Sequence, residues 1–139
     1  MYGIICEGHF DAAHFLADYH GTCENLHGHR WRVGATLEAP ELKGSGDERA
    51  MVMDFSEAKR LVAEACAELD HTFLYEEGTL AEATIAALEG EGFNLTALPF
   101  RTTAENLARH IFRRLRAKGL PVARVEVDET PHNRAFYEG

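Results

Sequence analysis

HGHRWRVGATLE, residues 27–38, is the stretch that decides the class of fold, because polar and apolar side chains alternate along it. Successive side chains of a β-strand point to opposite faces of a sheet. One face of this strand therefore carries His27, His29 and Trp31, followed by aliphatic residues, while the charged residues point the other way. The pattern predicts a half-buried strand whose inner face begins with two histidines.

Further strands are predicted on both sides of this stretch. Residues 2–10 alternate in the same way, and residues 11–25 are interpreted as a polar connection. A loop rich in glycine precedes residues 50–53, which we expect to return as a hairpin partner. Residues 122–129 and 135–137 alternate near the C-terminus. The strands are therefore expected in hairpin-like pairs.

Three segments between the strands have helical periodicity. Residues 55–69 repeat apolar side chains at helical spacing behind Asp54, which we expect to cap the helix. Residues 79–89 predict a second, shorter helix. A third helix is predicted behind Thr102 and Glu105, with basic side chains in its last turns. This order favours an α+β domain with helices on one face of an antiparallel sheet.

Composition limits the classes of function. A chain of 139 residues suits a single domain over residues 1–139, and 14 basic against 23 acidic residues give a net charge of −9. That charge argues against nucleic acid as the main partner. The chain has no apolar run of roughly 20 residues and no signal-peptide pattern, so we expect no membrane partner and a cytoplasmic location. Three cysteines, an odd number, are expected to be reduced thiols.

Three histidines form a candidate metal site. His27 and His29 lie two residues apart on a strand, so their imidazoles point the same way, and His14 comes from the preceding segment. Three imidazoles with an open fourth position are the ligand set of a catalytic zinc. The alternative is a surface His-x-His pair together with a hydrogen-bonded core histidine. The third histidine favours the metal.

Four other residues carry reactive groups. Cys23 lies four residues before His27 and is interpreted either as the fourth ligand of a structural zinc or as a thiol whose pKa falls beside a cation. Asp70 and His71 form a candidate proton relay. Glu129 falls on the apolar face at the end of its strand, where a carboxylate needs a partner or a donor-rich ligand. The alternative for Glu129 is that the strand has already frayed.

Taken together, these motifs resemble the 6-pyruvoyl-tetrahydropterin synthase family, and within it most closely the bacterial 6-carboxy-5,6,7,8-tetrahydropterin synthases. Three residues separate Cys23 from His27, which resembles the spacing of these carboxy-forming enzymes. The matching segments follow the family's order over nearly the whole chain. They are FDAAHFL (10–16), CENLHGH (23–29), VMDF (52–55), LDH (69–71), TTAEN (102–106) and VDET (127–130).

The resemblance implies a fold, an assembly and a reaction. The fold would be a four-stranded antiparallel sheet with two main helices on one face, of the T-fold type, to which the pattern adds a short extra helix. The assembly would be a homohexamer, a dimer of trimers, with active sites between subunits. The reaction would be the zinc-dependent lyase conversion of 7,8-dihydroneopterin triphosphate to 6-carboxy-5,6,7,8-tetrahydropterin, with release of acetaldehyde and triphosphate, on the route to queuosine. The alternatives are a 6-pyruvoyl-tetrahydropterin synthase, which eliminates triphosphate without cutting the carbon chain, and a non-catalytic zinc-binding module.

The resemblance also assigns a role to each candidate residue. The metal ligands would be His14, His27 and His29. The catalytic residues would be Cys23, Asp70 and His71. The substrate-binding residues would be Glu129, Thr103 and Glu105.

Overall fold

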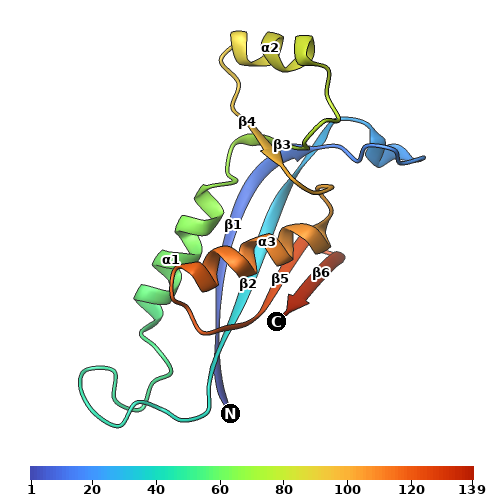
Figure 1. Cartoon of the computed structure of the whole chain (residues 1–139). Helices are drawn as coiled ribbons and strands as arrows, with labels where there is room; N and C mark the ends of the chain where they lie inside the picture. Colours follow the sequence, from blue (N-terminus) through green and yellow to red (C-terminus); the bar gives the residue numbers. More distant parts are fainter.

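A six-stranded sheet forms the body of the structure, a computed structural model that describes residues 1–139 (Figure 1). Its strands are β1 (Tyr2–His14), β2 (His27–Ala39), β3 (Thr72–Glu76), β4 (Leu95–Leu98), β5 (Val122–Thr130) and β6 (Asn133–Glu138). The helices are α1 (Phe55–Ala67), α2 (Glu82–Gly90) and α3 (Ala104–Ala117), with a short 3-10 helix, η1, at Thr22–Glu24. The strand order across the sheet is β4-β3-β1-β2-β5-β6.

The expectation of a four-stranded antiparallel sheet is wrong in two respects. Strands β1, β2, β5 and β6 do form an antiparallel ladder, but β3 and β4 extend the sheet beyond β1 and run parallel to it. These two strands have five and four residues, which is too short for a two-residue alternation to stand out in the sequence. The sheet is therefore mixed, although the α+β class is correct.

Residues 50–53 are also not a strand. The backbone around them forms a loop that is closed on itself, because Ala50 N–H donates to the carbonyl of Lys43 and Lys43 N–H donates to that of Met51. Ala50 adopts φ 65°, in the left-handed region, which ends any extended run. The strand β2, for which residues 50–53 were the expected partner, instead pairs with β1 over its whole length and with β5 on its other side.

Strand β1 is longer than predicted, which matters for the site. The alternation that begins at Tyr2 continues through Phe10 and Ala12 to His14, and these last three side chains are buried. The segment interpreted as a connection therefore begins only after His14.

The helices begin close to where the sequence places them. Asp54 caps α1 by accepting a hydrogen bond from Ser56 N at 2.6 Å. The cap of α3 is Thr103, which accepts from Asn106 N at 3.3 Å, and the predicted cap Thr102 is instead buried beneath the helix start. Helix α2 buries none of its residues and projects beyond β3 and β4 (Figure 1).

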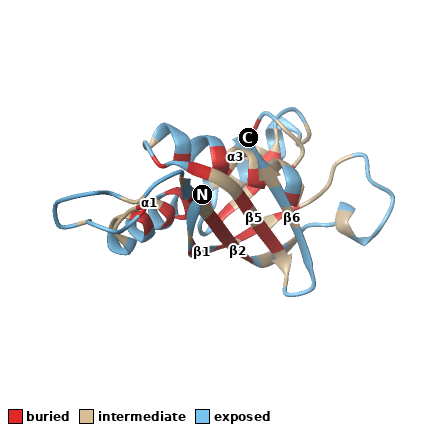
Figure 2. Ribbon diagram, turned by 90° about the horizontal axis from the view of Figure 1, so that it is seen from below, coloured by how far each residue is buried: buried red, intermediate tan, exposed pale blue.

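The hydrophobic core lies between the sheet and the two long helices (Figure 2). Trp31 is fully buried and stacks on Phe10 with ring centroids 5.9 Å apart, and its indole N–H donates to the carbonyl of Ala12. The opposite face of the sheet has no helix over it and carries charged side chains, such as Arg32 paired with Glu7 and Asp128. None of the helices has the length and apolar character that crossing a membrane requires.

Candidate metal centre

The β1–β2 ladder brings the three predicted histidines together. His14 pairs with His27 and Ala12 pairs with His29 across the two strands, so all three imidazoles lie on the inner face of the sheet. Their ring centroids are 4.6 Å apart for His14 and His27, 4.8 Å for His27 and His29, and 5.3 Å for His14 and His29. Trp31 follows on the same face and contacts two of these rings edge to face. The expected convergence is confirmed.

Backbone carbonyls hold two of the rings in a metal-binding orientation. The Nδ1 atom of His14 lies 2.9 Å from the carbonyl of Thr102, and that of His27 lies 2.6 Å from the carbonyl of Asn25. Because a carbonyl only accepts, Nδ1 must carry the proton, which leaves the lone pair on Nε2. The Nε2 atoms of His14 and His27 are buried and have no hydrogen-bond partner.

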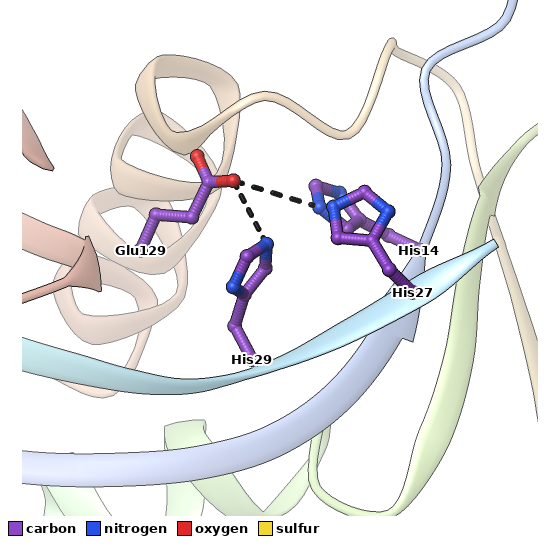
Figure 3. A group of neighbouring side chains, drawn as sticks. All are labelled: His14, His27, His29 and Glu129. Atoms are coloured by element: carbon purple, nitrogen blue, oxygen red, sulfur yellow. Dashed lines mark ion pairs between the residues drawn. The ribbon is translucent and has the colours of Figure 1, made fainter. Parts of the chain in front are cut away.

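Glu129 completes the cluster from β5 (Figure 3). Its Oε1 lies 2.8 Å from Nε2 of His29 and 3.9 Å from Nε2 of His14. The four possible ligand atoms all lie within 4.8 Å of one another. The prediction that this carboxylate lies on the inner face at the end of its strand is confirmed.

The electrostatics also suit a cation. Burial lowers the pKa of His14 to about 4, and burial lowers that of His29 against the opposing effect of Glu129. Both imidazoles are therefore neutral at pH 7, the state in which histidine binds metals. Three imidazoles and one carboxylate form a donor set that suits zinc. The residues present fit this metal.

Thr102 is a supporting residue that sequence reasoning missed. Besides its carbonyl, its Oγ1 lies 3.2 Å from Nδ1 of His14 and donates to the carbonyl of Phe15. Thr102 thereby connects the start of α3 to the end of β1, 88 residues away in sequence from His14. Its position before a helix indicated only a cap, and no local pattern could have revealed this long-range contact.

Cys23 lies outside the four-residue cluster. It is half-buried in η1, on the loop between the two ligand-bearing strands, and its carbonyl accepts a hydrogen bond from Leu16 N at 2.8 Å. This bond connects the cysteine to the chain two residues after His14. The acidic group whose oxygen lies within reach of the three histidines is that of Glu129, and the thiol of Cys23 is not part of this group.

Asp70 and His71 form the expected pair and are not part of the four-residue cluster. Asp70 Oδ2 accepts from Nδ1 of His71 at 2.9 Å, and its Oδ1 accepts from Asp11 N at 2.8 Å. The hydrogen bond that His71 donates to Asp70 raises the pKa of His71, whose side chain is 78% exposed. His71 lines a cleft of 630 Å³ together with Ala13, Arg30 and apolar residues of β3, β4 and the α2 region.

Thr103 and Glu105 lie together at the start of α3. The hydroxyl of Thr103 is engaged in capping the helix, and Glu105 is exposed in its first turn with no ion pair. Neither contacts the four-residue cluster. Their part in substrate binding stays a prediction.

Comparison with known protein families identifies the family to which the sequence belongs. The profile of the family described as 6-pyruvoyl tetrahydropterin synthase matches residues 3–139. The chain belongs to this family. The 6-pyruvoyl tetrahydropterin synthase family match spans every element of the structure, including the three histidines and Glu129.

Two similar sequences carry the name of the carboxy-forming branch of the family. The 6-carboxy-5,6,7,8-tetrahydropterin synthase of Haemophilus influenzae is 38% identical over 141 residues, covering 99% of both chains. The enzyme of that name from Synechocystis is 34% identical over 139 residues, covering 99% of this chain and 93% of its own.

Solved structures share the fold of the family. An uncharacterized protein from Wolinella succinogenes superposes with a TM-score of 0.76 at 23% identity, covering 99% of this chain and 97% of its own. The 6-pyruvoyl tetrahydropterin synthase of Caenorhabditis elegans superposes with a TM-score of 0.71 at 21% identity, covering 99% and 95%.

Proposed function

We propose that this chain is a zinc-dependent lyase that converts 7,8-dihydroneopterin triphosphate to 6-carboxy-5,6,7,8-tetrahydropterin, releasing acetaldehyde and triphosphate. The observation that carries the proposal is the cluster of His14, His27, His29 and Glu129 in a member of this family. The two relatives named for this product, which match nearly the whole chain, support the choice of reaction. The same proposal includes a cytoplasmic location and a role in the pathway that leads to queuosine.

The metal would be held by Nε2 of His14, His27 and His29. Zinc bound there supplies a Lewis acid that polarises oxygens of the substrate side chain and acidifies the neighbouring C–H bond. Thr102 and Asn25 keep the rings of His14 and His27 in the binding tautomer through their carbonyls.

The remaining residues would bind substrate and move protons. Cys23, on the loop between the two strands that carry the histidines, would accept the substrate proton at Sγ as a thiolate. His71 would exchange protons at Nε2, because its Nδ1 is engaged by Asp70. Glu129 would hold the pterin ring through the ring's amino and N–H donors, and Thr103 and Glu105 would line the adjacent segment.

We propose a homo-oligomer, a hexamer built as a dimer of trimers, as the working form. The cleft at His71 is lined by Ala12 and His29 and also by Ala13 and Arg30, and the last two side chains lie on the face of the ladder opposite His14 and His27. In an oligomer, the Asp70–His71 pair at this cleft would serve the metal site of a second subunit. Exposed apolar side chains around the cleft, Leu26 and Phe93, support contact with another subunit.

The product distinguishes this function from its nearest alternative. The test is to incubate the purified zinc-loaded protein with 7,8-dihydroneopterin triphosphate and to assay acetaldehyde and the pterin product together. Equal amounts of acetaldehyde and 6-carboxytetrahydropterin would establish the lyase. A 6-pyruvoyl product without acetaldehyde would place the chain in the pyruvoyl-forming branch, and the absence of turnover with metal bound would favour a zinc-binding module.

A further inference from the structure

We infer that the guanidinium of Arg101 binds a phosphoryl group, and that it holds the triphosphate tail of the substrate in this chain. This inference rests on the proposed function, because it assigns a further binding residue to the same site and the same substrate. It concerns the charged end of the substrate, which a chain with a net charge of −9 can hold only through a local cation.

Arg101 is a cation without a counter-charge. Its Nε and Nη2 atoms are buried and have no hydrogen-bond partner, and no other arginine of the chain has such atoms. The arginines on the outer face of the sheet, Arg30, Arg32 and Arg134, each pair with a carboxylate, whereas Arg101 takes part in no ion pair. A buried guanidinium without a partner is unfavourable, so an anionic ligand that pairs with Arg101 is favoured.

The two unpaired atoms form the edge of the guanidinium that binds oxyanions. The N–H groups of Nε and Nη2 point the same way, and their spacing matches two oxygens of a phosphate or a carboxylate. Arg114 uses the same two atoms in this structure to hold both oxygens of Glu68, at 2.9 Å each. The corresponding edge of Arg101 is therefore suited to bind a phosphoryl group at two points.

The backbone of Arg101 is fixed immediately before α3. Its carbonyl accepts hydrogen bonds from Thr103 N at 2.8 Å and from Asn106 Nδ2 at 3.0 Å. The amino end of a helix attracts anions, and here it has the same sign of charge as the neighbouring guanidinium. A cation held in place at such a position binds an anion at little cost in ordering.

The neighbours of Arg101 belong to the proposed site. The next residue, Thr102, contacts His14 through its carbonyl. The guanidinium lies over the ring of Tyr19, 5.6 Å from its centroid, and Tyr19 belongs to the loop that carries Cys23. The triphosphate is attached to the same short side chain whose oxygens would reach the metal, so its binding residue must lie beside the metal ligands and this loop.

Tyr19 has room to move when an anion binds. Its ring packs closely on the loop backbone, because a side chain at Gly21 would approach the ring to 2.7 Å. Tyr19 also lines a surface hollow of 450 Å³. A shift of the ring into this space would uncover the buried edge of Arg101 while the aromatic contact with the cation is kept.

The experiment measures binding of inorganic triphosphate to the zinc-loaded, full-length protein by calorimetry. The wild type is compared with Arg101→Gln, which removes the charge, and with Arg101→Lys, which keeps the charge and loses the two-point contact. The control Arg113→Gln removes an exposed charge further along α3. We expect Arg101→Gln to weaken binding by about tenfold or more, Arg101→Lys to bind with intermediate affinity, and the control to match the wild type.

Two further measurements exclude an indirect effect. Zinc affinity should be the same in all four proteins, which shows that the fold and the metal centre are intact. Triphosphate that contacts the metal does so in every variant, so the differences in affinity report the guanidinium. 7,8-Dihydroneopterin, which has the ring and the side chain without phosphates, should bind equally to the wild type and to Arg101→Gln.

Three results would each overturn the inference. They are the absence of triphosphate binding to the wild type, equal triphosphate affinity in the wild type and Arg101→Gln, and an equal loss of affinity for 7,8-dihydroneopterin and for triphosphate in Arg101→Gln. Turnover of 7,8-dihydroneopterin triphosphate by the zinc-loaded wild type decides the proposed function separately. A protein that binds triphosphate through Arg101 without turnover would keep the phosphoryl site and lose the lyase.

Discussion

His14 and His27 face each other as the last pair of the β1–β2 ladder, with ring centroids 4.6 Å apart. A shift of one residue in this pairing would turn one of the two rings to the opposite face of the sheet. The metal site therefore depends on the register of a 13-residue ladder whose other inward side chains, such as Phe10 and Trp31, belong to the core. Folding and ligand placement are determined together.

Replacing one of the proposed histidine ligands should strongly weaken metal binding and leave the protein folded. His27 is only half-buried, so His27→Ala should leave the protein folded and weaken zinc affinity by more than about a hundredfold, beyond the 10–100-fold effect of supporting residues. Zinc titration with a competing chelator measures this. His9→Ala, on the outer face of β1, is the control and should bind zinc like the wild type; equal affinity in both variants would refute the site.

The two adjacent threonines should have separable effects. Thr102→Val removes the hydroxyl near His14 and should lower zinc affinity by about tenfold. Thr103→Ala removes the helix cap and should lower the free energy of unfolding by about 1 kcal/mol without changing zinc affinity. Denaturant unfolding and zinc titration of both variants test the assignment, and a reversed pattern would contradict it.

Cys23 should be required for turnover and dispensable for the metal. Because Glu129 rather than the thiol completes the cluster, Cys23→Ala should retain zinc and lose at least about 10²-fold in turnover, as for the loss of a general base. Metal content and product formation are measured on the same sample. Cys66→Ala serves as the control for a buried core thiol, and loss of zinc from Cys23→Ala would instead favour a structural site.

Subunits that carry different defects should complement one another if the sites are shared. Cys23→Ala and His71→Ala are each expected to be inactive, and mixed oligomers would contain some sites with an intact cluster and loop from one copy and an intact Asp70–His71 pair from another. Refolding the two variants together should recover part of the wild-type rate. If oligomers that are shown to contain both variants recover no activity, His71 acts at the metal site of its own chain.

The titration of His71 should depend on Asp70. The hydrogen bond and charge of Asp70 raise the pKa of His71, so Asp70→Asn should move it down towards the ordinary value near 6.5. At a pH just above 6.5 a smaller fraction of His71 would then be protonated. Histidine ring resonances followed by NMR against pH measure the midpoint of His71, and the same midpoint in the wild type and Asp70→Asn would contradict the prediction.

Much of the site could be predicted from sequence because it is built from strand alternation. The two-residue period of residues 27–38 placed His27 and His29 on the inner face, and the same period placed Glu129 there. Both predictions required only local geometry. For the two histidines that geometry is dependable because the 13-residue strand β2 is paired with β1 over its whole length.

The rest depends on contacts that no local pattern contains. Strands β3 and β4 are short, and they are strands because they pair with β1 and with each other. Thr102 acquires its role from a carbonyl contact across the fold, and residues 50–53 are prevented from forming a strand by the left-handed turn at Ala50. The side of the sheet on which His71 lies likewise follows from tertiary structure.

Because β1 and β2 pair directly with each other, residues 15–26 form the connection between the two strands. The positions of His14 and His27 are set by the ladder, and within the intervening segment the carbonyl of Asn25 is the group that orients the ring of His27. Cys23 belongs to that segment. The proposed metal ligands therefore lie on the strands of the sheet and the proposed proton acceptor lies on a loop, so that natural variation or design could replace Cys23 without changing the strands that carry the histidines.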